Sequence, residues 1–357
     1  MEEFDKELEQ YGIFAKNGTK SIQKNNITLI NADIEKIDFN ILQENKIEKL
    51  YIENSEIKNI IFAKENDTNI NFTECTIKNH IFARDKTFNH NFVFLHCIFE
   101  KIVDFSKTKF KKRVDFKISK FKDEARFFNA NFLAEQKDDK TIENDFREVV
   151  FLDESFFTDV IFIGKVSFGY ATFKDEANFM RAKFLVKKRN CNIFENSFSD
   201  VVFNNKVFFN DATFEASVNF EATIFKSRAY LCNMQFKDKV SFGLAEFKDK
   251  VNFVQTKFLA KQKDDKTIEN NFREVVFNDK ISFGNVDFDS KVDFTLADFQ
   301  SKVYFISMNF KHEVYFNFTK FKDEILLKDL FFLKNTIKFI HSEINNINII
   351  STENTKP

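Results

Sequence analysis

The sequence predicts an all-β fold, a β-solenoid of about 13 coils, on three observations. Phe recurs in alternating steps of six and five residues, as in FKDKVSFGLAEFKDKVNFVQTKF at 236–258. A small, mostly apolar residue stands two positions before most of these Phe residues. The chain of 357 residues holds 53 Phe but only six Gly and one Pro, so the residues that usually mark turns and interdomain linkers are scarce.

The repeat unit fits short strands better than helices. In a strand, residues i and i+2 point to the same side, so Val240 and Phe242, then Ala245 and Phe247, face inward together. In a helix with an 11-residue repeat, the same four apolar positions would surround the axis instead of forming a stripe. Two such units make a 22-residue coil.

The 22-residue rhythm runs from Phe88 to Phe332. An earlier region, about 32–62, keeps simple steps of five with Ile as the bulky residue. A lone coil buries too little to offset its conformational entropy, so neighbouring coils must stabilise one another.

The triplets AKF at 182–184, ATF at 212–214 and ADF at 297–299 resemble the pentapeptide repeat family, here as a Phe-rich variant with alternating steps. The resemblance covers about 29–349 and departs from the family in every second step, which has six residues. It implies a right-handed quadrilateral β-helix.

Both ends need a cap, because open strand edges invite polymerisation. Phe4, Leu8 and Tyr11 share one helical face, so we expect a short N-terminal capping helix over residues 2–14, within a cap of residues 1–20. One solenoid domain is predicted for 21–350, and a disordered tail for 351–357. The apolar segment 324–340 is either an intramolecular cap or the surface of an end-on homodimer.

Three insertions interrupt the rhythm, near 133–145, 185–197 and 259–271. FLAEQKDDKTIENDFREVVF at 132–151 returns at 258–277 with 18 of 20 positions identical, and FLVKKRNCNIFENSFSDVVF at 184–203 is a diverged copy. Each turns a six-residue step into a 14-residue step. Their offsets, once the inserted residues are removed, are whole numbers of coils, so all three loops are predicted to leave the same corner.

The loop tips are the candidate partner-binding residues, since functional loops are often displayed on rigid scaffolds. A neutral loop copied by segmental duplication is the alternative. The predicted residues are Lys137, Asp138, Asp139, Lys140, Lys187, Lys188, Arg189, Lys263, Asp264, Asp265 and Lys266.

The sequence offers no catalytic or metal-ligating pattern. The five His form no HxxxH or HExxH pair, no Cys joins them at metal spacing, and no phosphate-binding Gly loop is present. We therefore expect no enzyme activity, no catalytic residues, no cofactor and no metal. Cys75 and Cys97, one coil apart in the rhythm, are predicted to stack as reduced core thiols, and Cys191 to be the most reactive thiol.

The predicted function is that of a non-enzymatic scaffold that binds a protein partner. Some relatives within the pentapeptide repeat family mimic duplex DNA and bind topoisomerases such as gyrase, which is the alternative function. DNA mimicry needs continuous acidic bands, whereas here 54 Lys and Arg balance 55 Asp and Glu and alternate at the corners.

The same balance gives no reason to expect direct nucleic-acid binding. We find no membrane segment and no signal peptide, and the CxxC spacing is absent, so a cytoplasmic location is expected. The abundance of Lys, Asn, Ile and Phe suggests a bacterial source.

Overall fold

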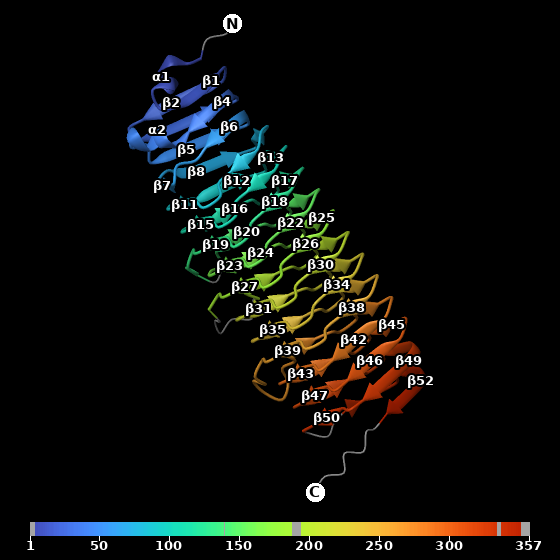
Figure 1. Ribbon diagram of the computed structural model, residues 1–357. Helices are drawn as coiled ribbons and strands as arrows, with labels where there is room; N and C mark the ends of the chain where they lie inside the picture. Colours follow the sequence, from blue (N-terminus) through green and yellow to red (C-terminus); the bar gives the residue numbers. More distant parts are fainter. Residues whose placement is uncertain (1–3, 139, 188–193, 334–336, 351–357) are drawn as a thin grey trace. The chain divides into compact units, whose positions relative to one another are not determined.

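The computed structural model describes residues 4–138, 140–187, 194–333 and 337–350. It divides into two compact units, residues 1–175 and 176–357, and each is a β-solenoid of stacked coils (Figure 1). The two units hold about 14 turns in all, with little helix, which confirms the predicted all-β solenoid. The four-sided cross-section, the right-handed sense and the single domain over 21–350 stay predictions. The tail at 351–357 lies outside the described residues.

Each 22-residue turn contributes four short strands, one to each of four stacks of strands, numbered here in chain order. In unit 1 the first stack holds β7 (Glu65–Asn66), β11 (Thr87–Phe88), β15 (Lys109–Phe110), β19 (Asn131–Phe132) and β23 (Ile161–Phe162). The second holds β2 (Thr19–Gln23), β3 (Asn26–Ile30), β5 (Lys49–Glu53), β8 (Asn69–Thr73), β12 (Phe92–Leu95), β16 (Val114–Asp115), β20 (Asn144–Asp145) and β24 (Val166–Ser167). The third holds β1 (Ile13–Lys16), β4 (Asp33–Asp38), β6 (Glu56–Ile61), β9 (Thr76–Ile77), β13 (Ile98–Phe99), β17 (Lys120–Phe121), β21 (Val150–Phe151) and β25 (Thr172–Phe173). The fourth holds β10 (Ile81–Phe82), β14 (Val103–Asp104), β18 (Ala125–Arg126) and β22 (Ser155–Phe156).

Unit 2 repeats this arrangement. Its first stack holds β27 (Lys183–Phe184), β31 (Thr213–Phe214), β35 (Gln235–Phe236), β39 (Lys257–Phe258), β43 (Asp287–Phe288), β47 (Asn309–Phe310) and β50 (Phe331–Phe332). The second holds β28 (Asn196–Ser197), β32 (Val218–Asn219), β36 (Val240–Ser241), β40 (Asn270–Asn271), β44 (Val292–Asp293), β48 (Val314–Tyr315) and β51 (Ile337–Lys338). The third holds β29 (Val202–Phe203), β33 (Ile224–Phe225), β37 (Glu246–Phe247), β41 (Val276–Phe277), β45 (Asp298–Phe299), β49 (Lys320–Lys328) and β52 (Glu343–Ile350). The fourth holds β26 (Ala177–Asn178), β30 (Val207–Phe208), β34 (Ala229–Tyr230), β38 (Val251–Asn252), β42 (Ile281–Gly284) and β46 (Val303–Ile306), and β46 pairs with the second half of β49.

The register confirms the 22-residue coil. Val218 pairs in parallel with Val240, and Phe214 with Phe236, each the equivalent residue of the next turn. Where an insertion intervenes, Val240 pairs with Asn270 instead of Gln262, so the insertion adds eight residues without disturbing the stacks. In the early region the turn from Lys49 to Asn69 has 20 residues, as four steps of five predict. The turn before it, from Asn26 to Lys49, has 23 residues and departs from that prediction.

Phe side chains fill the interior and stack along the coils. The second stack of unit 2 carries a continuous column of rings with centroids 4.8–5.1 Å apart, made of Phe198, Phe220, Phe242, Phe272, Phe294, Phe316 and Phe339. Val240 and Phe242 are both fully buried, which confirms that the two residues face inward together. Offset ring stacking adds to the free energy gained by burial.

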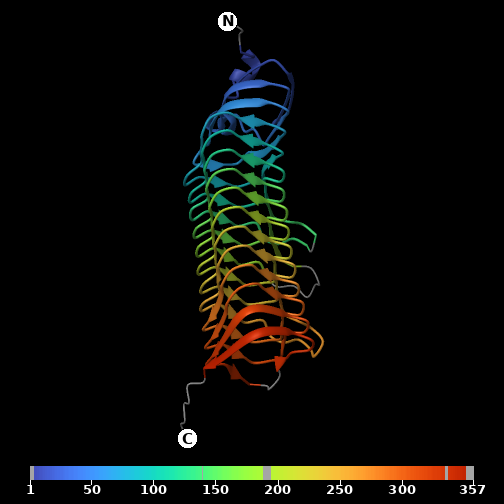
Figure 2. The ribbon, with the colours of Figure 1, turned by 90° about the vertical axis from the view of Figure 1, so that its right-hand side faces the viewer.

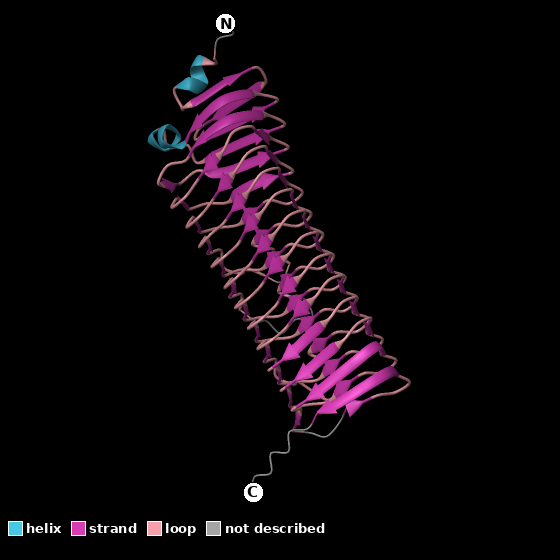
Figure 3. Cartoon of the chain, turned by 45° about the vertical axis from the view of Figure 1, so that its right-hand side comes forward, coloured by secondary structure: helices cyan, strands magenta, loops and turns pink. Residues whose placement is uncertain are grey.

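The N-terminal cap differs from the prediction. The helix over residues 2–14 is wrong in length, because α1 spans only Lys6–Glu9. Gly12, with φ of 77°, turns the chain into β1, which pairs antiparallel with β4. Leu8 is the one buried residue of α1. A second helix, α2 (Phe39–Glu44), was not predicted, and it lies in the turn that leads from β3 to its parallel neighbour β5. Figure 3 shows both helices at the start of unit 1.

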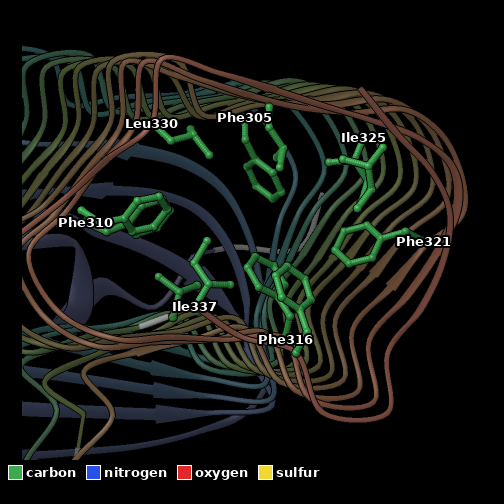
Figure 4. Close-up of a pocket in the computed structure, with 12 residues that line it drawn as sticks. Phe305, Phe310, Phe316, Phe321, Ile325, Leu330 and Ile337 are labelled. Carbon is green, nitrogen blue, oxygen red and sulfur yellow. The ribbon is translucent and has the colours of Figure 1, made fainter. Parts of the chain in front are cut away.

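The apolar segment 324–340 forms part of the last turns of unit 2, and whether it acts as a cap or as a dimer surface stays a prediction. Most of its described residues lie in β49, β50 and β51, and Phe331 and Leu333 are 64% and 75% exposed. An apolar cavity lies between the last turns, lined among others by Phe305, Phe316 and Ile337 (Figure 4). This end therefore presents apolar side chains to solvent.

Candidate functional site: the inserted loops

Each inserted loop joins a strand of the first stack to a strand of the second. In unit 1 the loop lies between β19 and β20; in unit 2 the loops lie between β27 and β28 and between β39 and β40. The two loops of unit 2 therefore leave the same corner, three turns apart, as predicted. Figure 2 shows the loop of unit 1 in green and the later loop of unit 2 in orange, each projecting from its coils. That all three loops share one line stays a prediction.

The base of each loop is marked by an Asn in a column that is otherwise apolar, with Val on both sides of two of the Asn residues. Asn144 stands between Val114 and Val166 in the register, and Asn270 between Val240 and Val292. Asn144, Asn196 and Asn270 are fully buried, and each donates its amide Nδ2 to a main-chain carbonyl of the next turn. No group among the described residues donates a hydrogen bond to their Oδ1 atoms.

A buried Glu precedes each of these Asn residues, and Glu143 ties the loop of unit 1 to the solenoid. The Glu143 carboxylate accepts hydrogen bonds from the backbone N–H of Lys137 in the loop, at 3.1 Å, and of Lys165 in the next turn, at 3.0 Å. Glu143 and its counterparts Glu195 and Glu269 are at most 3% exposed. A buried carboxylate that bridges two backbone segments holds the loop in one place.

The loop at 259–271 has a second anchor in Lys291, which is 4% exposed. Its ammonium donates to the main-chain carbonyl of Asp265 at the tip, and its backbone N–H donates to the side chain of Gln262 at 2.8 Å. Glu313 also lies within 3.7 Å of the Lys291 ammonium. A buried lysine with a carbonyl and a carboxylate beside it fixes the loop electrostatically.

Asp138 and Asp264, at the tips of two loops, make the same set of hydrogen bonds. Asp138 accepts from the backbone N–H of Lys140 at 2.8 Å and of Thr141 at 2.6 Å, and from the Thr141 hydroxyl. Asp264 does the same with Lys266 and Thr267. Three donors to one carboxylate lower the pKa of Asp138 to about 2, chiefly through the Thr141 N–H, and they lower the pKa of Asp264 as well.

The described tip residues from the sequence prediction are all exposed, as a binding surface requires: Lys137, Asp138, Lys140, Lys187, Lys263, Asp264, Asp265 and Lys266. Asp139, Lys188 and Arg189 lie outside the described residues. Sequence reasoning missed the anchors Glu143, Asn144 and Lys291. The Glu-Asn pair that recurs at the end of all three insertions was the available signal.

The cysteines give no disulfide among the described residues. Cys75 and Cys97 are free, buried and one turn apart, since the main-chain carbonyl of Cys75 accepts from Ile98 N–H at 2.8 Å. Burial raises the pKa of the Cys97 thiol well above its usual value. Cys191 lies outside the described residues. Within the described part of the chain, no group of His, Cys, Asp and Glu has metal-binding geometry.

Surface charges are paired across neighbouring turns. Lys58 lies 2.8 Å from Glu35, Lys122 lies 2.8 Å from Glu100, and Lys237 lies 2.7 Å from Glu215, each pair separated by one coil. In the described ranges, no helix is long and apolar enough to cross a membrane. Comparisons with protein-family models, curated proteins and solved structures gave no match to this chain.

Proposed function

We propose that this protein is a non-enzymatic, cytoplasmic scaffold of the pentapeptide-repeat type from a bacterium, which binds a protein partner through its inserted loops. The observation that carries the proposal is the matched construction of the loops at 133–145 and 259–271. Each has a carboxylate-capped tip, a buried Glu at its base and exposed Lys and Asp side chains. A preorganised loop loses little conformational entropy on binding, which favours recognition.

Neutral duplication explains why the inserted sequences are similar. It does not explain why each insertion keeps a buried Glu and a buried Asn, which cost stability. A buried Glu and an Asn in the Val column are less stable choices than the Val and polar corner residues of an ordinary coil. Their presence at every insertion favours a role for the loops.

The test compares the intact chain with a rod in which eight residues are removed from each insertion. Deleting 135–142, 187–194 and 261–268 restores the six-residue step and keeps the Glu-Asn pair. We expect the intact chain, but not the rod, to capture the same protein repeatedly from a bacterial lysate. Circular dichroism should show that the rod is folded. Equal capture of every partner by both chains contradicts the proposal.

A finer variant removes only the turn at each tip. Asp138→Ala with Asp264→Ala should weaken capture, because the tip loses the bonds that define its shape. The matched control is Asp249→Ala with Asp279→Ala, since these two Asp residues also cap a backbone N–H but lie at ordinary corners. Loss of capture in the control as well would assign the effect to general surface charge.

The alternative, a DNA mimic that binds a topoisomerase, has no observation in its favour. The carboxylates on neighbouring turns are neutralised by Lys residues 2.7–2.8 Å away, whereas mimicry of a phosphate backbone needs them unpaired. We therefore expect a gyrase supercoiling assay to be unaffected by a tenfold excess of this protein. Inhibition or protection of gyrase would reverse the order of the two proposals.

An end-on homodimer through 324–340 is a second candidate, favoured by the exposed Phe331 and Leu333. The apolar cavity between the last turns, which Leu330 and Ile337 help to line, also favours it (Figure 4). Exposed apolar patches on soluble proteins often mark interfaces. If this end carries the dimer contact, Phe331→Asp with Leu333→Asp halves the particle mass measured by light scattering. An unchanged dimer mass, or a monomeric wild type, would contradict this pairing.

A further inference from the structure

Unit 2 has two rows of residues with left-handed backbone conformation, each with one residue per turn. We call the row that follows the second stack the apolar edge: Asp200, Ala222, Leu244, Glu274, Leu296, Phe318 and His341, with φ of 53–62°. The row that follows the fourth stack is the polar edge: Arg181, Asp211, Asn233, Gln255, Asn285, Ser307 and Asp329, with φ of 51–62°. Residues in both rows must therefore adopt the same left-handed backbone conformation.

The two rows nevertheless differ in composition. The polar edge uses Asn and Asp at most positions, which is what a left-handed conformation favours. The apolar edge instead carries Leu244, Leu296 and Phe318, bulky residues that this conformation disfavours. They are 59%, 47% and 50% exposed, so burial in the core does not account for them either. Strained residues of this kind point to a contact made outside the chain.

We propose that the apolar edge of unit 2 binds the apolar edge of a second copy of this chain, antiparallel, about a two-fold axis at Glu274. The order of residues along the edge is self-complementary around that position. One turn away on either side, Leu296 faces Leu244 of the second copy. Two turns away, Phe318 faces the small Ala222. Three turns away, His341 faces Asp200, whose carboxylate can accept a hydrogen bond from the imidazole.

The spacing of the row also favours a second solenoid over another kind of partner. Adjacent positions are held one strand apart by backbone hydrogen bonds, such as Leu244 N–H to Arg273 carbonyl at 2.9 Å and Leu296 N–H to Asn317 carbonyl at 2.8 Å. The edge therefore repeats at about 4.8 Å, a period that another stack of strands matches at every turn. In a two-fold interface each pair of facing residues, such as Leu244 with Leu296, occurs twice.

The centre and the ends of the edge carry the groups that set its register. Glu274 meets its own copy at the axis, and the neighbouring Arg273, which is exposed and contacts Asp293 at 3.2 Å, lies within reach of that second Glu274. At the end of the apolar edge, the His341 ring stacks on the Phe318 ring with centroids 5.4 Å apart, so these two neighbours of the row contact each other. Because the contact is a narrow line, we expect a dissociation constant of about 1–100 µM.

The test replaces Leu244, Leu296 and Phe318 together by Asn in the full-length protein. Asn suits the left-handed positions, so the triple variant should fold at least as well as the wild type. Sedimentation velocity up to about 300 µM should give twice 42.3 kDa for the wild type and 42.3 kDa for the variant. A wild type that stays monomeric, or a triple variant that keeps the dimer mass, overturns the proposal.

Two controls separate this interface from alternative dimer contacts. Gln255→Asn changes a left-handed position on the polar edge and should leave the dimer intact. Phe331→Asp with Leu333→Asp removes the end-on candidate and should also leave the dimer intact. If instead this pair abolishes the dimer and the Asn triple variant does not, the apolar edge is not the interface.

A charge exchange tests the register. Asp200→Lys alone removes the carboxylate that faces His341 and should weaken the dimer. Asp200→Lys with His341→Asp moves the carboxylate to position 341, opposite the new lysine, and should recover the wild-type dissociation constant. Failure of the double variant to recover contradicts the proposed antiparallel register.

Discussion

At the residue scale, position in the coil decides conformation more strongly than residue type. In each turn two residues adopt φ near 55°, and Ile118, Tyr170 and Leu244 do so although a branched or bulky side chain opposes it. The main-chain bonds to the next turn enforce the conformation, as for Ile118 N–H to Arg147 carbonyl at 2.9 Å. The solenoid therefore overrides local propensity at these sites.

A substitution at Ile118 in unit 1 can measure the free energy that a branched residue costs at a left-handed position. Ile118→Asn should raise the free energy of unfolding by about 1 kcal/mol, because Asn tolerates the left-handed region and the side chain is already partly exposed. Urea denaturation would measure the change in the free energy of unfolding, provided that its dependence on urea concentration has the same slope in both chains. As a control, Asn129→Ile places a branched residue at another left-handed position of unit 1, with φ of 54°, and should lower the free energy of unfolding by a similar amount. Equal stability of all three chains would show that the strain is negligible.

Asn144 is a second residue whose cost is measurable. Asn144→Val should stabilise unit 1 by about 1 kcal/mol, because Val continues the column of Val114 and Val166 and removes a buried amide oxygen without a hydrogen bond. The Lys165 carbonyl keeps its bond from the backbone N–H of residue 144. Thermal unfolding of the two chains checks the sign, and a lower midpoint for the variant would assign Asn144 an essential structural role.

At the element scale, the sequence predicts what repeats and misses what occurs once. The Phe spacing predicted the 22-residue coil and the eight-residue insertions, because every turn repeats the same burial pattern. The spacing missed α2, because its sequence NILQE occurs in one turn only and is not part of the repeat. The capping helix was predicted too long because the stripe of Phe4, Leu8 and Tyr11 ignored the left-handed turn at Gly12.

The candidate site was predicted in part for the same reason. The duplicated letters KDDK located the tips, but nothing local shows that Glu143 is buried beneath its loop and bound to Lys165 one turn later. Such contacts join residues that are a whole coil apart, so they become readable only once the coil length is known.

The tip turn has a measurable signature in Asp138. Its pKa of about 2 is depressed by the bonds from Thr141 and Lys140, so the carboxylate stabilises the turn fully above about pH 4. That contribution is lost as the pH falls through about 2. Carboxyl NMR should therefore show Asp138 titrating near 2, and Thr141→Val should move the midpoint back toward 3.8. A wild-type midpoint near 3.8 would mean that the turn is not formed in solution.

At the scale of the whole molecule, a stack of strands is limited by its ends. The first strands of unit 1 are covered: β2 pairs antiparallel with β3, and α1 is capped by Asp5, which lies 2.6 Å from the Lys20 ammonium. The exposed side of β2 carries charged and polar residues, a feature that discourages further strand addition. With a net charge of only −1, overall repulsion contributes little to keeping copies apart, so the cover over the first strands must prevent end-to-end strand addition.

Removing the cover should therefore cause association. Deletion of residues 2–23 exposes the edge of β3, with Ile27 and Leu29 beneath it, and leaves a row of unpaired backbone groups. We expect the shortened chain to form particles much larger than a dimer in light scattering, at concentrations where the intact chain does not. Asp5→Ala is the matched control, because it removes the helix cap and the ion pair, at about 1 kcal/mol, but keeps β2 in place. A shortened chain that keeps the mass distribution of the intact one would show that β2 is dispensable as a cover, and that the charges on the remaining turns suffice to prevent stacking.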